Sequence, residues 1–519
     1  MKLISLSKIL IPSFVFLSVS CTDTGSSSKS KKTETPTETP EEQETPYPMD
    51  PNAAVYNLRA IPTTEDVKSA FENHNPVPNK KPNIFLFVVD TMRRDHVTPN
   101  LTPNTYDFAN DANAVTFKNM SSNAVSTYFS QTALYHSVHG MARPYMMDDD
   151  FTAGSINLNV LKSAGYDIHL FGRPNNNFCF EEDHDAFTPQ YWNNRFLYSN
   201  EPIDFMGGRC QPYAKTKKNY ARNDHLFVSA FKNEFQDILF NYGDKANLFI
   251  FWLDGVHAPY TFPKDEIGKV YEPFFQGVPG ETLFTDKEDR KAIKNAYKNA
   301  VQGADYQFGR VINKIKSKGM FDESMIVIMS DHGERLFSSH YQGDDRFKTA
   351  HSGIGYNELL DNVFYMKFPA GSLAEVQSLD ERNTKDQSVG IKDIFPTIFD
   401  YLGVDYPAKM KEQLVGQSLF KDQPKYCQAN YSPDWDRPPY FTFRNKDKKV
   451  YVKMEREKKR SRQVAFKIMH YFDENDRTIS AQKLKENYQI TDPSDRKQQD
   501  KFLLTHFKDC MDQVVVLGD

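Results

Sequence analysis

The sequence predicts an α/β fold with a mostly parallel central sheet flanked by helices, followed by a small C-terminal antiparallel sheet plus helix. Three apolar runs support the central sheet, because each ends at or just before an aspartate: residues 84–89, 248–253 and 325–329. Continuous apolar runs are typical of strands covered on both faces, as in a parallel sheet. Between the last two runs, apolar residues step by three and four from Ile293 to Ile315, which predicts an amphipathic helix that packs on the sheet. Strand, helix and strand in this order imply a right-handed crossover within one sheet.

The N-terminal end has the features of a secretory signal. Residues 1–20 combine Lys2 and Lys8 with an apolar run from Ile9 to Val19 that is too short to span a bilayer as a mature helix. Cys21 follows at once, as in a bacterial lipoprotein processing site, although Ser18 stands where an aliphatic residue is more usual. Ordinary signal cleavage is the alternative. We expect an exported protein of the bacterial cell envelope, lipid-anchored to a membrane and facing the periplasm or the cell surface.

The segment after the signal contains almost no apolar residue. From Thr22 to Pro48 the chain consists mainly of Ser, Thr, Lys, Glu and Pro, which cannot bury a core. We expect residues 21–48 to form a disordered lipoprotein tether. The remaining chain is long enough for one large α/β domain and an appendage.

The net charge and the cysteines limit the possible partners and disulfides of the protein. A net charge of −5, with both signs interspersed, gives no electrostatic case for nucleic acid as a partner. Four cysteines remain besides Cys21, and an exported protein meets an oxidising compartment. Cys179–Cys210 and Cys427–Cys510 are plausible disulfides, but four cysteines permit three pairings and the sequence does not choose among them.

Acidic and imidazole side chains follow the three predicted strands. They are Asp90 after the first, Asp254 and His257 after the second, and Asp331, His332 and Glu334 after the third. In open α/β sheets, ligands bind outside the carboxyl ends of the strands. A single aspartate in this place is usually a helix cap or a turn residue. Three strands that deliver acids to one edge, two of them with a histidine, favour a metal or phosphate site.

A hydroxyl-rich segment, "NAVSTYFSQTALYHSVHG", spans Asn123 to Gly140. Its serines and threonines admit two interpretations. They cap a helix N-terminus through its free backbone N–H groups, or one of them acts as a nucleophile.

The C-terminal part alternates in the manner of hairpin strands over residues 438–455 and 463–476, with turn-like breaks between them. Residues 496–514 show helical spacing. This pattern predicts a C-terminal α+β subdomain over residues 421–519.

Four stretches together resemble the sulfatase and alkaline phosphatase superfamily: residues 82–119, 303–334, 391–404 and 414–419. They lie in the family's order and at its spacing across nearly the whole mature chain. The resemblance implies a sulfatase-like catalytic domain over residues 49–420 with the small C-terminal sheet and helix after it.

The resemblance also implies a role for the hydroxyl-rich segment. Sulfatases carry Cys-x-Pro-Ser-Arg or Ser-x-Pro-Ser-Arg at a helix N-terminus, and its first residue becomes formylglycine. In this chain the motif aligns with Thr127 to Gln131. Threonine cannot become formylglycine, and the proline and arginine are absent. Thr-x-x-Ser instead resembles the phosphoethanolamine- or phosphoglycerol-transferring branch and the nucleotide phosphodiesterases, where threonine is the nucleophile. The resemblance therefore implies that Thr127 is catalytic.

Metal ligands follow from the same resemblance. Asp90, Thr127, Asp331 and His332 match the family's ligands at the first strand, the nucleophile and the last strand. Three oxygens and one imidazole nitrogen suit one divalent metal, Zn²⁺ or Mn²⁺. A sulfatase Ca²⁺ site has Asp-Asp after the first strand and Asp-Asn at the last strand. Here the two sequences are "VVDT" and "SDHG", so both differ from a Ca²⁺ site. A second metal position is an open alternative.

That second position would draw on Asp254 and His340. His257 and His351 resemble the histidines that contact substrate phosphate in the transferase branch, and an imidazole that titrates near neutrality is suited to protonate a leaving oxygen. Arg173 lies where sulfatases carry the lysine and histidine that hold sulfate, and its guanidinium suits a bidentate oxyanion contact. The alternative for all three is an ordinary surface side chain.

These observations predict a metal-dependent hydrolase or transferase of phosphate (or sulfate) esters that works through a threonine nucleophile. The expected partner is an anionic ester, such as an envelope lipid or glycan. One alternative is a sulfuric ester hydrolase without formylglycine, and another is an inactive binding lipoprotein with a sulfatase fold. The substrate is not predicted, because loops such as residues 180–208 contain no motif.

Overall fold

The computed structural model describes residues 49–148, 151, 153–171, 246–258, 260–274, 287–337, 349–351, 353–383, 389–421, 427–432, 439–457 and 461–517. The chain divides into two compact units, residues 1–43 and 44–519, and every described residue belongs to the second. The predicted signal, tether and lipidation site lie outside the described residues, as do Cys21, Arg173, Cys179, Cys210 and His340.

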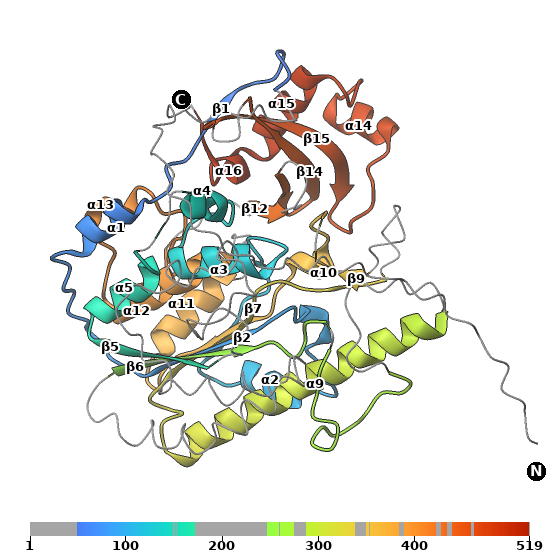
Figure 1. Ribbon diagram of the computed structural model, residues 1–519. Coiled ribbons are helices and arrows are strands. Elements are labelled where there is room, and N and C mark those ends of the chain that lie inside the picture. Colours follow the sequence, from blue (N-terminus) through green and yellow to red (C-terminus); the bar gives the residue numbers. More distant parts are fainter. Residues whose placement is uncertain are drawn as a thin grey trace, which may run out of the picture. The chain divides into compact units, whose positions relative to one another are not determined.

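The central sheet has six strands in the order β3-β10-β7-β2-β6-β5 (Figure 1). The strands are β2 (Ile84–Val89), β3 (Ala114–Thr116), β5 (Tyr166–Phe171), β6 (Ala246–Leu253), β7 (Met325–Ser330) and β10 (Phe364–Lys367). β5, β6, β2 and β7 pair in parallel, whereas β10 runs antiparallel to β7 and to β3. The predicted mostly parallel sheet is therefore confirmed.

The register of the three central strands brings their ends to one edge. Val89 at the end of β2 pairs with Leu253 of β6 and with Ser330 of β7. The next residues along the chain are Asp90, Asp254 and Asp331. All three aspartates therefore leave the sheet at the same edge, as the sequence predicted.

Both faces of the sheet are covered by helices (Figure 1). Ile84, Leu86 and Val88 of β2 belong to one hydrophobic cluster, while the alternate residues of the strand belong to another. The first cluster includes α3 (Thr127–His136), α5 (Ile156–Ser163) and α12 (Ile394–Leu402); the second includes α2 (Pro103–Ala109) and α9 (Lys287–Ser317). A strand that buries both faces needs no polar alternation, which explains its continuous apolar run. α9 confirms the predicted amphipathic helix.

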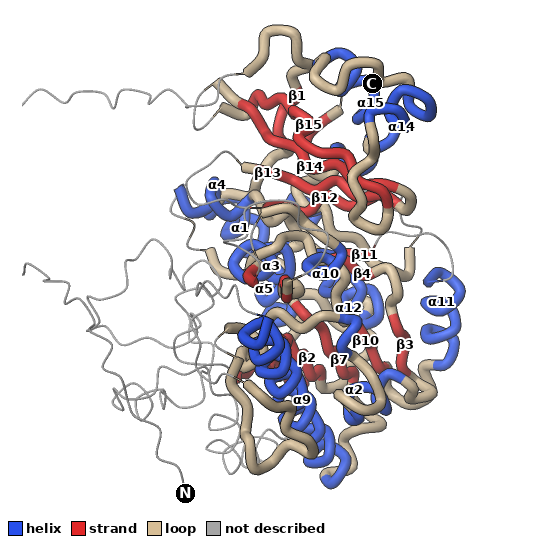
Figure 2. Tube along the Cα trace, turned by 90° about the vertical axis from the view of Figure 1, so that its right-hand side faces the viewer, coloured by secondary structure: helices blue, strands red, loops and turns tan. Residues whose placement is uncertain are grey.

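The C-terminal sheet is antiparallel, with the order β12-β13-β14-β15-β1-β16 (Figure 2). Its strands are β12 (Cys427–Ser432), β13 (Tyr440–Asn445), β14 (Lys448–Glu455), β15 (Gln463–Asp473), β1 (Tyr56–Leu58) and β16 (Val515–Val516). The helices α14 (Ala481–Tyr488), α15 (Arg496–His506) and α16 (Lys508–Met511) belong to the same part of the chain. The expected strands and helix after residue 421 are thus present.

Two features of this sheet bear on the sequence predictions. Cys427 and Cys510 form a disulfide, which is one of the two pairs expected from the sequence. β1 comes from residues 56–58, which the sequence analysis placed within the catalytic domain, yet it pairs with β15 and β16. The start of the described chain therefore completes the C-terminal sheet, and no local pattern in the sequence indicated this.

The remaining elements are shorter. They are α1 (Thr64–Phe71), a 3₁₀ turn (Arg94–His96), β4 (Met120–Ser121), α4 (Ala142–Asp148), β8 (Arg335–Leu336), β9 (Thr349–Ala350), α10 (Asn357–Leu360), α11 (Leu373–Asn383), β11 (Val389–Gly390), a second 3₁₀ turn (Ile391–Asp393) and α13 (Ala408–Lys411). Among the helices in the described ranges, none has both the length and the apolar character that a membrane span requires.

Candidate active site

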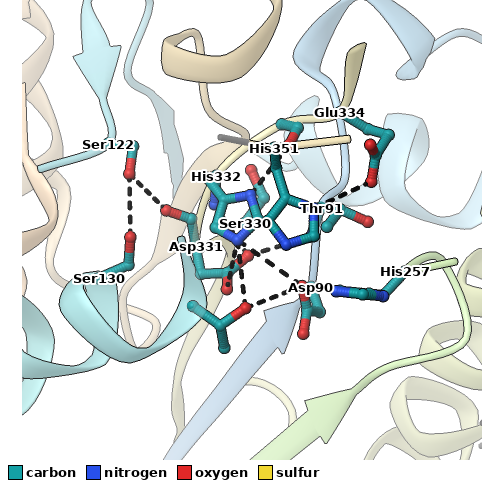
Figure 3. A network of polar contacts seen from close by, with 12 residues as sticks. Asp90, Thr91, Ser122, Ser130, His257, Ser330, Asp331, His332, Glu334 and His351 are labelled. Atoms are coloured by element: carbon teal, nitrogen blue, oxygen red, sulfur yellow. Dashed lines mark hydrogen bonds and ion pairs between the residues drawn. The ribbon is translucent and has the colours of Figure 1, made fainter. Parts of the chain in front are cut away.

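Three predicted metal ligands meet beyond the carboxyl ends of β2 and β7 (Figure 3). Asp90 follows β2, and Asp331 with His332 follows β7. One ligand atom from each lies within 4.8 Å of the others, and all three residues are buried. Nε2 of His332 is 4.0 Å from Oδ1 of Asp90 and 3.5 Å from Oδ2 of Asp331. Two carboxylates and an imidazole buried together form a donor set that suits a divalent cation.

The two oxygens of Asp331 have different surroundings. Oδ1 accepts hydrogen bonds from the backbone N–H groups of Thr91 at 3.0 Å and His332 at 2.8 Å. No hydrogen bond from the described part of the chain reaches Oδ2, although the residue is 1% exposed. Burial raises the pKa of Asp331, while the neighbouring His332 and the backbone donors oppose that shift. A buried carboxylate oxygen without a donor costs free energy unless a cation balances it, so the residues present fit a metal ion.

The orientation of His332 also suits a ligand. Its Nδ1 lies 2.9 Å from the carbonyl oxygen of Gly333, which can only accept a hydrogen bond. Nδ1 must therefore carry the proton, and in the neutral ring the lone pair of Nε2 faces the two carboxylates.

Gly333 is required by the close approach of α10 to this loop. A Cβ at position 333 would lie 1.9 Å from the carbonyl oxygen of Glu358, and the Gly333 N–H donates to the carbonyl of Leu359 at 2.9 Å. Any side chain here would force α10 away from the loop that contains Asp331 and His332.

Thr127 is the first residue of α3, and its hydroxyl points at the same cluster. Thr127 Oγ1 lies 3.2 Å from Nε2 of His332 and 3.5 Å from Oδ1 of Asp90. Ser126 is the N-cap residue, but its side chain makes no capping bond to this described helix. The helix N-terminus stabilises negative charge near Thr127. The capping interpretation of the segment therefore does not hold for Ser126, and the hydroxyl of Thr127 is directed at the buried cluster.

The other hydroxyls hold the segment in place. Ser130 Oγ donates to the carbonyl of Ala124 at 3.1 Å and lies 3.1 Å from Ser122 Oγ. Ser122 Oγ in turn donates to the carbonyl of Asp331 at 2.6 Å. These bonds connect the start of α3 to the loop after β7, so the position of Thr127 is coupled to that of Asp331.

The C-terminal sheet contacts the same segment. The N–H of Tyr431 on β12 donates to the carbonyl of Asn123 at 2.9 Å, and the N–H of Val125 donates to the carbonyl of Tyr431 at 3.1 Å. Ala124 thereby forms a parallel bridge with β12. The segment that leads into α3 is consequently held from two sides.

His257 and His351 complete the group of imidazoles (Figure 3). The ring of His351 lies 4.6 Å from the ring of His257 and 4.6 Å from the ring of His332. Nδ1 of His257 is 2.7 Å from the carbonyl oxygen of Ala258, so this ring too is fixed through Nδ1. Asp254 is fully buried beyond β6 but is not part of the metal-suited group found among the described residues. A second metal that uses Asp254 and His340 stays a prediction.

Comparison with known proteins identifies the family. The sulfatase family model matches residues 82–404. The chain belongs to the sulfatase family. This confirms the resemblance to the sulfatase and alkaline phosphatase superfamily drawn from the sequence.

Individual relatives of this sulfatase-family chain are distant. A multifunctional alkaline phosphatase superfamily protein of Trinickia caryophylli is 27% identical over 134 residues, which is 26% of this chain and 23% of the relative. Arylsulfatase K of Bos taurus is 25% identical over 195 residues, 36% of this chain and 32% of the relative. The chain thus spans about a quarter to a third of these curated relatives.

Solved structures share the sulfatase fold over most of their length. The phosphonate monoester hydrolase of Agrobacterium radiobacter has a TM-score of 0.55 and 16% identity, covering 82% of this chain and 95% of that one. A 2-O GAG sulfatase has a TM-score of 0.52 and 15% identity, covering 85% of this chain and 95% of that one. At these identities the likeness concerns the fold, and it confirms the α/β architecture.

Several residues that shape this sulfatase site were not singled out from the sequence. Thr91 has a φ of +61°, a left-handed conformation that is uncommon for a threonine. In it, the N–H of Thr91 reaches Asp331, and its carbonyl accepts from the hydroxyl of the buried Tyr297 at 2.8 Å. Tyr297 accepts from the N–H of Arg93 at 2.9 Å. No sequence motif marks a left-handed threonine, so only the folded chain reveals this contact.

A cavity of about 480 Å³ is lined by charged and polar side chains. Its lining comes from the turn after β2, from α10 and the residue that follows it, and from the turn after β15: Arg93, Arg94, Asp95, Asn357, Glu358, Asp361, Asn475, Asp476 and Arg477. Arg93 pairs with Asp95 and with Glu358, and Arg94 pairs with Asp361. The charges of this cavity are thus largely engaged in contacts within the protein.

Proposed function

We propose that this sulfatase-family protein is a metal-dependent enzyme that hydrolyses or transfers a phosphate ester through Thr127. The observation that carries the proposal is the position of Thr127 Oγ1 at a helix N-terminus, 3.2 Å from His332 and 3.5 Å from Asp90. A hydroxyl is a weak nucleophile unless its surroundings stabilise the anion. In this protein the hydroxyl of Thr127 points at the only group of described residues that is suited to hold a metal ion.

Asp90, Asp331, His332 and the hydroxyl of Thr127 would hold the metal ion. The mixed oxygen and imidazole donors suit Zn²⁺ or Mn²⁺ better than Ca²⁺. When bound, such an ion lowers the pKa of a coordinated hydroxyl and withdraws charge from an ester oxygen. The buried Oδ2 of Asp331, which receives no hydrogen bond from the described residues, and the Nε2 of His332, which faces the two carboxylates, support this assignment.

Each side chain of the site has a separate role in the proposed reaction. The hydroxyl of Thr127 gives its proton to solvent, and Oγ1 attacks the phosphorus atom. The bond from phosphorus to the leaving oxygen breaks, which leaves a phosphate ester on the threonine. His257 and His351 would hold the substrate phosphate and give a proton to the leaving oxygen. Water or an acceptor hydroxyl then takes the phosphoryl group from Thr127. The N-terminus of α3 stabilises negative charge on Oγ1 at each step.

A sulfate ester is the second candidate substrate, and the sulfatase match supports it. Thr127 stands where a sulfatase has the residue that becomes formylglycine, so a sulfatase of this kind would work with an unmodified hydroxyl. An inactive binding protein is the third candidate. The buried cluster of two acids and a histidine opposes it, because such a cluster costs stability without a ligand.

One set of assays separates the three candidates. Purified protein is incubated with a bis-aryl phosphate, an aryl phosphate and an aryl sulfate, and its metal content is measured on the same preparation. Turnover of a phosphate ester, with bound metal, supports the proposed function. Turnover of the sulfate alone supports the second candidate, and inactivity on all three with no bound metal supports the third.

We also propose that the protein acts in the cell envelope, attached through a lipid on Cys21. The signal-like residues 1–20 and the polar residues that follow Cys21 support this location. An anionic ester on an envelope lipid or glycan would be the substrate within reach.

A further inference from the structure

A short antiparallel pair of strands places Glu334 opposite His351. Arg335 of β8 pairs with Ala350 of β9, and Leu336 pairs with Thr349. Extending this register by one residue brings position 334 opposite position 351. Directly opposed residues of an antiparallel pair lie close enough for their side chains to interact. The ladder therefore specifies the pair, although each strand is only two residues long.

The side chains of this pair meet. Oε2 of Glu334 lies 3.3 Å from Nδ1 of His351 (Figure 3). The glutamate side chain is 1% exposed and the histidine side chain is 21% exposed. The carboxylate is thus enclosed, whereas the ring is partly exposed.

Glu334 is itself held firmly. Its carbonyl oxygen accepts a hydrogen bond from Nη1 of Arg93 at 3.2 Å. The same nitrogen of Arg93 pairs with Glu358 at 2.8 Å, and the other guanidinium nitrogens pair with Asp95. Burial raises the pKa values of Tyr260 and Tyr297, and the negative charge of Glu334 raises them further. The backbone of Glu334 is consequently held by Arg93, independently of any substrate.

The hydrogen bond fixes the orientation of His351. A carboxylate only accepts, so Nδ1 of His351 donates and Nε2 is the nitrogen left for the substrate. The ring lies between His257 and His332, 4.6 Å from each. Without the carboxylate the ring would be free to turn about its side-chain torsions, and Nε2 would lose its fixed direction.

We propose that Glu334 is the positioning residue for His351: it holds the imidazole so that Nε2 faces the leaving oxygen of the ester. This inference rests on the role proposed above for His351 in the reaction. Glu334 does not touch the reacting atoms, and it acts through the histidine.

Four variants test the inference in the full-length protein: Glu334→Ala, Glu334→Gln, His351→Ala and the double variant Glu334→Ala/His351→Ala. We expect Glu334→Ala to lower kcat by about 10- to 100-fold, with a smaller change in KM and with wild-type metal content. Glu334→Gln should recover part of the loss, because the amide oxygen still accepts from Nδ1. The double variant should be no slower than His351→Ala alone, since both changes remove one function.

The choice of leaving group gives a second readout. A poor leaving group, such as an alkyl or phenyl oxygen, needs the histidine more than 4-nitrophenolate does. The loss in Glu334→Ala and in His351→Ala should therefore be larger for the poor leaving group, and by a similar factor in the two variants. A purely structural defect would slow both substrates equally.

Glu455 provides the matched control, because it is a buried glutamate that pairs with Arg496 at 2.9 Å in the C-terminal sheet. Glu455→Gln should keep wild-type kcat. The inference is overturned if Glu334→Ala keeps wild-type kcat while His351→Ala is slow, if the losses multiply in the double variant, or if Glu334→Ala loses its metal. Wild-type turnover in His351→Ala would instead refute the proposed role of the histidine, and the inference with it.

Discussion

Thr127→Ala removes one hydroxyl from the candidate site and leaves the helix that presents it. The lost oxygen is the proposed attacking atom and one of the proposed metal ligands. We expect kcat to fall by at least about 10³-fold, which corresponds to roughly 4 kcal/mol in the activation barrier. Substrate should still bind through the remaining groups, so KM should change much less.

The fold should tolerate this change. Thr127 is half-buried, and its hydroxyl contacts Asp90 and His332 and not the helix backbone. Alanine is also the better helix former, so the free energy of unfolding should stay within about 1 kcal/mol of the wild type. A large loss of activity with an unchanged thermal transition would separate chemistry from stability.

Ser130→Ala is the matched control. Ser130 is buried, and its hydroxyl bonds to Ala124 and Ser122, so its removal should cost about 1 kcal/mol in stability. Because these bonds also help to hold the start of α3, turnover should fall somewhat, but far less than in Thr127→Ala. Thr127→Ser keeps the attacking oxygen and should retain part of the activity. Mass spectrometry of quenched reactions should find a phosphate adduct on the peptide that contains Thr127. Wild-type turnover in Thr127→Ala, with Ser130→Ala inactive, would refute the assignment of the nucleophile.

Four further predictions concern other parts of the chain. Asp331→Ala and His332→Ala should each lose most bound metal while keeping the circular dichroism of the wild type; full metal content by elemental analysis would move the site elsewhere. Cys427→Ser should lower the free energy of unfolding by about 2–5 kcal/mol in denaturant titrations, because the disulfide closes a loop with a sequence separation of 83. Burial lowers the pKa of His139 to about 4, with Lys392 adding to this effect. As the pH falls, the histidine of the unfolded chain, with a pKa near 6.5, takes up a proton before the buried histidine of the folded protein does. The free energy of unfolding should therefore fall by roughly 3 kcal/mol as the pH drops from about 6.5 to 4, and His139→Gln should not show that fall. Radiolabelled palmitate should enter the wild type but not Cys21→Ala, and absence of label from both would indicate plain secretion.

The parts of the fold that the sequence predicted are those whose pattern is local. β2, β6 and β7 are buried on both faces, so their burial appears directly as continuous apolar runs. The aspartates could be placed because a strand end is also a local signal, whereas Thr127 was singled out by the resemblance to the sulfatase and alkaline phosphatase superfamily. The Cys427–Cys510 pair was one of the plausible pairings, and the sequence could not choose among them, so the structure was needed to select it.

The parts that the sequence did not predict depend on contacts between distant segments. β1 joins the C-terminal sheet through pairing with β15, more than 400 residues along the chain, and its three residues have no distinctive pattern. The left-handed conformation of Thr91 follows from its neighbours and not from its own preference. Glu334 was noticed beside His332, yet its partner His351 emerges only from the register of β8 and β9.

The placement of the candidate nucleophile depends on both sheets. From the catalytic side, Ser122 connects the segment before α3 to the carbonyl of Asp331. From the other side, the backbone of Tyr431 bonds to Asn123 and Val125. A displacement of β12 would therefore move Thr127 relative to His332, and a distance of 3.2 Å leaves little room for such movement. The C-terminal sheet thus contributes to the geometry of the site without supplying any of the proposed metal ligands.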